Sequence, residues 1–281
     1  MSHRSMLLAV ALASAVPTAV RAQAPAPAPN PYRILSIGRE SVKPGKSEAH
    51  DKMEGEWSHV IANSKMPYGF LAITSITGAK ENWYISGYPT YTEYAKMAKA
   101  FSDNPALIAA GKRFDPMESD LLSDSRGMML LLRDDLSYGS AVDMATMRSF
   151  SITRISVRPG HVAEFEEARK LTKQAHETAH VTDSYSVYEA TAGAPAGTFF
   201  VFVARKSLAE LDDASRIHNA QYLAALGGED GRKKMAAMAA NYLNGTQTDL
   251  YAFLPAQSVV SAKWAASDPT YWKLRTTPMA P

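Results

Sequence analysis

A seven-residue segment that occurs twice constrains the fold of this chain more than any other feature of its sequence. The segment RESVKPG at 39–45 recurs as RISVRPG at 154–160, with five positions identical and a basic residue at a sixth in both copies. In each copy a strand-like run precedes the Pro-Gly pair, which favours a turn, and an amphipathic helix follows. Repetition of a whole strand-turn-helix unit predicts a chain built from two related halves.

The later segments of the two halves also follow one order. After the first helix come two runs rich in aromatic and β-branched residues, then a helical stretch, then a closing apolar run. We expect strands and helices at 33–42, 46–64, 68–77, 82–88, 90–123 and 128–132 in the first half, and at 149–157, 161–180, 184–191, 198–204, 207–243 and 249–254 in the second. This β-α-β-β-α-β order predicts an α+β fold with two tandem ferredoxin-like repeats, at 32–140 and 147–255. Because the free face of each antiparallel sheet needs cover, the two sheets are expected to pack into a pseudo-twofold α/β barrel.

The strand-Val-Lys/Arg-Pro-Gly-helix openings at 42–45 and 157–160, with the doubled element order, resemble the dimeric α/β-barrel superfamily. That superfamily includes the antibiotic-biosynthesis-monooxygenase-like and NIPSNAP-like families, and the resemblance covers about residues 32–255. It implies the barrel fold, in a group that includes cofactor-free monooxygenases, haem-handling proteins and small isomerases; no motif selects one of these activities. Since both sheets belong to one chain, we expect a monomer in place of the dimer of single-repeat relatives.

The N-terminal segment is typical of an export signal. A short polar start with Arg4 is followed by an apolar run at 6–16, which is too short to span a bilayer. We expect a signal peptide at 1–22 with cleavage after Ala22, and the alternative is an uncleaved anchor. Alternating Ala and Pro at 23–31 predict an extended linker, and the processed protein is expected in the periplasm or outside the cell.

Composition excludes several classes of site and partner. The chain has no cysteine, which excludes disulfides, Cys-ligated zinc and thiolate nucleophiles. Its 30 Lys and Arg against 28 Asp and Glu give a formal charge of +2, without the basic surplus typical of nucleic-acid binding. We expect no nucleic-acid partner, no cofactor and no membrane segment after signal cleavage. Trp264, Tyr271 and Trp272 predict that the tail at 256–281 packs on the domain.

The segment His176-Glu177-Thr178-Ala179-His180 matches the H-E-x-x-H pattern of zinc proteases. The fold argues against a metal there, because this helix would lie outside the barrel, and the first half has Ile61 and Lys65 at the matching positions. We therefore interpret His176 and His180 as surface histidines near a helix C-terminus and predict no metal site. His50, which aligns with Phe165, is interpreted as a partly buried structural histidine.

Arg39 and Arg154 occupy equivalent positions in the two motif copies. If their strand face lines the barrel, they would meet near the pseudo-twofold axis and could hold an anionic or enolate-like ligand. The alternative is that each arginine pairs with a carboxylate such as Glu40 at the rim. Glu189 is a candidate general base if its side chain points inward, and it has no role if the side chain points outward.

Trp83, Tyr84 and Tyr188 are candidates for an aromatic wall that would bind a planar apolar ligand, and the alternative is that they are ordinary core residues. Our leading interpretation is an exported small-molecule-binding protein with a pocket inside the barrel and a small apolar or aromatic ligand. One alternative is a cofactor-free monooxygenase- or isomerase-like enzyme acting on a planar aromatic or enolisable substrate. A second alternative is a structural or interaction protein with a packed barrel.

Overall fold

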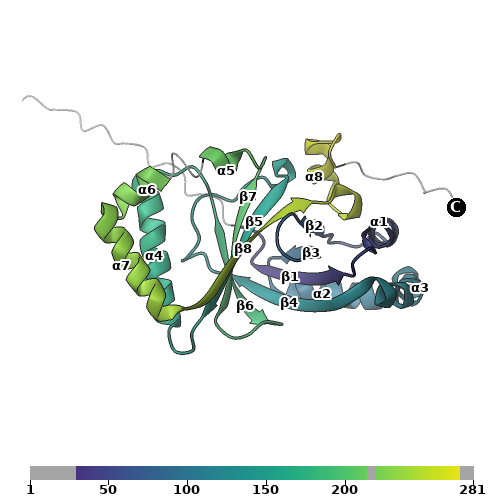
Figure 1. Ribbon diagram of the computed structural model, residues 1–281. Helices are drawn as coiled ribbons and strands as arrows, with labels where there is room; N and C mark the ends of the chain where they lie inside the picture. The colour runs from purple at the N-terminus through teal and green to yellow at the C-terminus, as the bar shows by residue number, and fades with distance from the viewer. Residues whose placement is uncertain (1–29, 214–218, 273–281) are drawn as a thin grey trace, which may run out of the picture.

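Eight antiparallel strands close into a barrel in the computed structural model, which describes residues 30–213 and 219–272 (Figure 1). The strand order around the barrel is β1-β3-β2-β8-β5-β7-β6-β4. The strands are β1 Ile34–Val42, β2 Leu71–Ser75, β3 Glu81–Tyr88, β4 Leu122–Leu132, β5 Ser149–Val157, β6 Ser186–Ala192, β7 Thr198–Arg205 and β8 Leu243–Phe253. The predicted signal peptide at 1–22 and nearly all of the linker lie outside the described residues.

Each motif copy begins on a strand that lies between two other strands of its own half. β1 pairs with β3 and β4, and β5 pairs in the same way with β7 and β8. The two sets of strands join where β2 meets β8 and where β4 meets β6. The predicted α+β class and the closed barrel are therefore confirmed.

The helices cover the outside of the barrel in two groups, as Figure 1 shows. One group is α1 Ser47–Asn63, α2 Tyr91–Ser102 and α3 Pro105–Leu121, and the other is α4 Val162–Ala179, α5 Glu210–Asp213, α6 Asn219–Ala225 and α7 Gly228–Tyr242. The expected helical stretch at 90–123 is broken because Pro105 starts a new helix, capped by the Asn104 side chain, which accepts bonds from the amides of Ala106 and Leu107. No helix in the described ranges is long and apolar enough to cross a membrane.

Side chains that alternate along the strands fill the inside of the barrel. Leu35 and Ile37 of β1, Trp83 of β3 and Phe200 of β7 belong to one buried cluster that continues across both sets of strands. Aromatic rings dominate this cluster, and several of them pack edge to face. Large aromatic and aliphatic side chains therefore pack much of the barrel interior.

The segment after β8 closes one end of the barrel. It contains a short 3₁₀ turn at Pro255–Gln257 and α8 Ala262–Ser267. Trp272 is 2% exposed within the barrel core, and its indole N–H donates to the Ala145 carbonyl at 2.6 Å. Arg148 pairs with Asp268 from this segment. Arg39 and Arg154 lie towards the opposite end of the barrel along β1 and β5, which we call the open end.

One glycine allows the loop between β6 and β7 to approach β4 closely. Gly193 has φ +78°, and a Cβ there would lie 2.1 Å from the Gly127 carbonyl oxygen. Gly160 of the second motif copy has φ +85° but open space around it. Gly160→Ala is therefore expected to lower the free energy of unfolding by about 1–2 kcal/mol, because alanine disfavours the left-handed backbone conformation. Gly193→Ala should lower the free energy of unfolding clearly more, because its methyl group would also overlap the Gly127 carbonyl oxygen. Urea denaturation of both variants measures the difference, and equal losses would contradict it.

Candidate functional site

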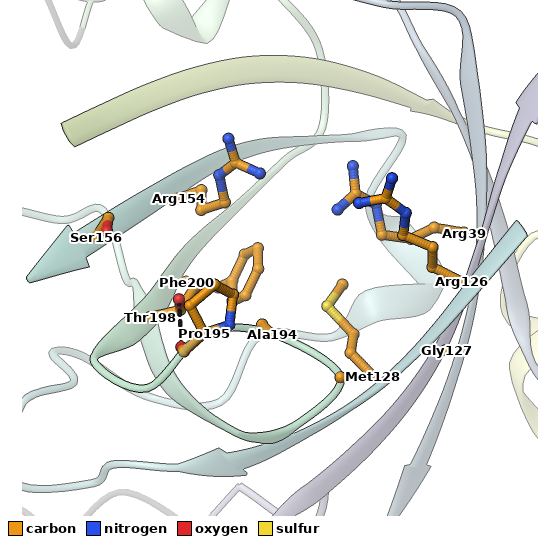
Figure 2. A pocket seen from close by; sticks show the side chains of 11 residues that line it. Arg39, Arg126, Gly127, Met128, Arg154, Ser156, Ala194, Pro195, Thr198 and Phe200 are labelled. Atoms are coloured by element: carbon orange, nitrogen blue, oxygen red, sulfur yellow. Dashed lines mark hydrogen bonds between the residues drawn. The ribbon is translucent and has the colours of Figure 1, made fainter. Parts of the chain in front are cut away.

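The open end of the barrel holds a pocket of about 260 Å³ whose lining includes three arginines. Arg39 comes from β1, Arg126 from β4 and Arg154 from β5. Figure 2 shows Arg39 and Arg126 together on one side of the pocket and Arg154 on the other. We call this the mouth pocket.

Strand register explains how the arginines reach the same pocket. Arg39 lies directly opposite Arg126 in the β1–β4 pair and opposite Trp83 in the β1–β3 pair. Directly paired residues project to the same face of a sheet, and Trp83 belongs to the barrel core. Arg126 could not be recognised from the apolar pattern, because the apolar run of that strand begins only at Met128, whereas the strand itself begins at Leu122.

Two of the three guanidinium groups are already neutralised. Nη2 of Arg39 lies 2.7 Å from both carboxylate oxygens of Glu81. Glu81 also accepts the indole N–H of Trp83 at 2.8 Å, and the Arg39 guanidinium stands 4.7 Å from the centre of the Trp83 ring. Arg126 pairs with Asp124 at 2.6 Å. The expected carboxylate pairing thus occurs for Arg39, with Glu81 as the partner in place of Glu40.

Arg154 has no carboxylate within 4.0 Å among the described residues. Within the described part of the chain, the Nη2 of Arg154 donates to the Gln247 side-chain oxygen at 3.5 Å. The mouth pocket therefore carries an uncompensated positive charge beside an apolar surface formed by Met128, Pro195 and Phe200. Such a combination favours an anion with an apolar body.

The predicted aromatic residues do not gather in one cavity. Trp83 lies within the barrel near the mouth, packed against Phe200 and Tyr251 with ring centres 6.1 and 5.0 Å away. Tyr188 is also inside the barrel, but its hydroxyl donates to the Tyr32 carbonyl at 2.8 Å, away from the mouth pocket. Tyr84 lies on the opposite face of β3 from Trp83, where burial raises its pKa well above the usual value.

Glu189 points away from the barrel interior. It follows the inward-facing Tyr188, so alternation puts it on the outer face. There it accepts from Arg133 at 3.0 Å, and Arg133 also contacts Glu166 of α4 at 2.6 Å. Glu189 therefore does not have the inward orientation that a general base inside the barrel would need.

The H-E-x-x-H segment ends α4 on the outside of the barrel. Nδ1 of His176 lies 2.8 Å from the Thr172 carbonyl oxygen, and its ring packs against the rings of Tyr138 and Tyr222. His180 follows the helix as its C-terminal cap, in the left-handed region with φ +50°. The two histidines thus have separate local roles at the helix end.

A second polar group lies beneath α1, on the outer face of the sheet. Nε2 of His50 lies 2.8 Å from a Glu40 carboxylate oxygen, and Glu54 sits one helical turn after His50. Burial and the nearby charge of Glu40 raise the pKa of Glu54 to about 8. We call Glu40, His50 and Glu54 the buried triad. His50 is 0% exposed, so its interpretation as partly buried is wrong.

One difference between the two halves of the sequence indicates the buried triad. In the second motif copy the residue matching Glu40 is Ile155, and the residue matching His50 is Phe165. Both of those residues belong to an apolar cluster between the sheet and α4. Polar residues at matched core positions of one half only are a pattern that points to a local function.

Comparison with known proteins identifies the fold. No family model matches the chain, and no curated protein matches it. An anthrone oxidase-like protein of known structure is similar at 11% identity with a TM-score of 0.51, covering 79% of this chain and 92% of its own. A protein from Fusobacterium nucleatum named as a candidate monooxygenase is 16% identical over 79% of this chain and 92% of its own, with a TM-score of 0.47.

A chlorite dismutase variant from Candidatus Nitrospira defluvii is 9% identical over 81% of this chain and 93% of its own, with a TM-score of 0.45. At these identities the likeness concerns the fold alone, and proteins with this fold carry different activities. The chain therefore has an α+β barrel fold similar to that of the anthrone oxidase-like protein, and its function has to be argued from its own side chains.

Proposed function

We propose that the chain is an exported small-molecule-binding protein whose mouth pocket holds a small organic anion. The observation that carries this proposal is the meeting of Arg39, Arg126 and Arg154 at one pocket, where Arg154 has no carboxylate partner among the described residues. A carboxylate or enolate at the mouth pocket would supply the missing negative charge through paired N–H···O bonds.

The apolar part of the pocket narrows the ligand class. Met128, Pro195 and Phe200 offer contacts for a flat apolar or aromatic body, and a volume of about 260 Å³ suits a small molecule. The packed barrel core leaves the mouth as the place for binding, which modifies the sequence-based expectation of a pocket within the barrel.

We further propose that the two halves arose by duplication of one ferredoxin-like unit and that the protein is a monomer. The motif copies at 39–45 and 154–160, and the matching partners of β1 and β5, support this proposal. The signal-like sequence at 1–22 supports export of the protein.

Removal of the Arg154 side chain is expected to weaken anion binding about 10- to 100-fold, because a charge-assisted hydrogen bond contributes about 1.5–3 kcal/mol. Isothermal titration with benzoate measures the dissociation constant, and benzamide is the neutral probe of the same shape. Wild-type protein should prefer benzoate, and Arg154→Ala should lose that preference. Arg33→Ala is the control, because Arg33 is an exposed arginine at the other end of β1, paired with Asp134.

Two results would contradict the proposal. Equal affinity of the wild-type protein for benzoate and benzamide would remove the role of charge. Equal weakening in Arg154→Ala and Arg33→Ala would remove the role of the mouth pocket. Either result would favour the structural alternative, which the packed core of the barrel also supports.

A second candidate function is oxygenase chemistry on an enolisable planar aromatic substrate. It is favoured by the guanidinium groups of the mouth pocket, which can stabilise an enolate, and one fold neighbour is named anthrone oxidase-like. Oxygen consumption with anthrone, measured with the wild-type protein and with Arg154→Ala, tests it. Consumption that requires Arg154 would support an enzyme, and a rate equal to that of buffer would leave a binding protein.

A further inference from the structure

The buried triad unites three metal-ligand side chains from two elements. Glu40 comes from β1, whereas His50 and Glu54 lie on one face of α1 at i, i+4 spacing. One donor atom from each of the three lies within 4.8 Å of the others. His50 is 0% and Glu54 5% exposed, so the triad sits in the low-dielectric layer between helix and sheet.

Two buried polar atoms beside the triad lack partners in the described structure. They are Nδ1 of His50 and the side-chain oxygen of Asn82, and both residues are 0% exposed. Asn82 lies directly opposite Glu40 in the β1–β3 pair, so its side chain projects to the same face. Buried polar atoms are nearly always satisfied, and this unpartnered oxygen belongs to a residue on the same face of the sheet as Glu40, where a cation would satisfy it.

The other half of the barrel shows that the fold itself does not require Glu40, His50 or Asn82, whereas the position of Glu54 holds another charged residue there, Arg169. Ile155 and Phe165 occupy the positions that match Glu40 and His50. Phe199 pairs with Ile155 as Asn82 pairs with Glu40. Phe165 and Phe199 pack with ring centres 4.4 Å apart in an apolar cluster. Polar groups at the matching places therefore need an explanation other than packing, because burying them without compensation costs stability.

We infer that the buried triad of Glu40, His50 and Glu54 is a binding site for one divalent transition-metal ion. When a metal ion displaces the proton of the Glu54 carboxyl, two carboxylates and a neutral imidazole carry two negative charges, which a divalent ion neutralises. The mixture of nitrogen and oxygen donors suits Zn²⁺, Mn²⁺ or Fe²⁺ better than Ca²⁺ or Mg²⁺, which take oxygen ligands. The side-chain oxygen of Asn82 would be a fourth donor. This inference departs from the sequence-based expectation of no metal and is independent of the mouth pocket.

Metal-bound histidines usually donate their second ring N–H to a carboxylate or carbonyl. A carboxylate oxygen of Asp51 lies 3.8 Å from Nδ1 of His50, beyond hydrogen-bond distance, and would accept that proton only after moving closer. The Gln257 amide donates to the same Asp51 oxygen at 2.9 Å and fixes its position.

The test is a titration of chelator-treated, full-length protein with Zn²⁺ and with Mn²⁺, followed by calorimetry. We expect one ion per chain. His50→Gln and Glu54→Gln are expected to weaken binding at least about 10-fold, and Asp51→Asn about 10- to 100-fold. His161→Gln is the matched control, because it changes an exposed His–Glu pair at the start of α4. Addition of Co²⁺ provides a visible spectrum that reports the coordination directly.

The outcomes are distinguishable. Wild-type binding that is lost in Glu54→Gln and kept in His161→Gln supports the site, and urea denaturation shows whether each variant is folded. Absence of binding of Zn²⁺, Mn²⁺ and Co²⁺ by wild-type protein would overturn the inference. Equal binding by wild-type protein and folded Glu54→Gln would overturn it as well. Neither failure would affect benzoate binding at the mouth pocket.

Discussion

Trp83→Ala is expected to lower the free energy of unfolding by about 3–5 kcal/mol, the range for removing a large aromatic side chain from a core. Trp83 is 3% exposed and packs against Phe200 and Tyr251 inside the barrel, near the mouth. Its indole N–H also donates to Glu81, so the substitution leaves a buried acceptor with one partner fewer. Urea denaturation followed by far-UV circular dichroism measures the loss.

Two variants control this measurement. Trp83→Phe retains a ring in the core, so its free energy of unfolding should fall less than that of Trp83→Ala. Tyr91→Ala removes a ring that is 47% exposed, and its effect should stay within about 0.5 kcal/mol. A loss below about 1 kcal/mol in Trp83→Ala would mean that the barrel interior is not packed as described.

Trp272→Ala is expected to lower the free energy of unfolding by a similar amount, about 3–5 kcal/mol, although the residue lies after the last strand. Its ring is 2% exposed and contacts Phe253, Trp264 and Tyr271, and its N–H donates to the Ala145 carbonyl. The substitution would open the closed end of the barrel. The midpoint and slope of urea denaturation give the change.

Trp264→Ala is the comparison for Trp272→Ala. Trp264 is only partly buried, and its indole nitrogen has no partner in the described structure. We expect the Trp264 variant to lose clearly less stability than the Trp272 variant. Equal, small losses would indicate that the segment after β8 does not support the barrel.

The sequence predicted the barrel because the signals for it are local and occur twice. A Pro-Gly turn between strand and helix can be identified without tertiary contacts, and its repetition defined two equivalent strands. The same equivalence indicated that Arg39 and Arg154 would meet if their strand face lined the barrel, with carboxylate pairing at the rim as the alternative; both residues line the mouth pocket, and Arg39 also pairs with Glu81.

The orientation of the strands could not be predicted, because both faces of this sheet are buried and carry aromatic residues. Trp83 and Tyr84 are neighbours in sequence, yet one lies in the barrel core and the other beneath α1. The same uncertainty affected Glu189, whose outward direction follows from Tyr188 facing the core. Alternation gives the relative direction of neighbours, and only tertiary packing decides which face is inside.

The buried triad was missed because its members come from separate elements. His50 and Glu54 share a helix face, but Glu40 reaches them only when β1 packs beneath α1. A single histidine on an apolar helix face is usually structural, so its isolated pattern gave no reason to expect a site. Comparison of the two halves position by position would have revealed the polar substitutions.

The central claim is that the mouth pocket binds an organic anion through Arg39 and Arg154. The most direct test is nuclear magnetic resonance of the arginine side-chain Nε–H groups during titration with benzoate. The account predicts that the Arg39 and Arg154 signals shift together along one saturating curve, while the Arg148 signal stays unchanged, because Arg148 pairs with Asp268 at the closed end of the barrel. Unchanged Arg39 and Arg154 signals, or an equal shift of Arg148, would contradict the claim.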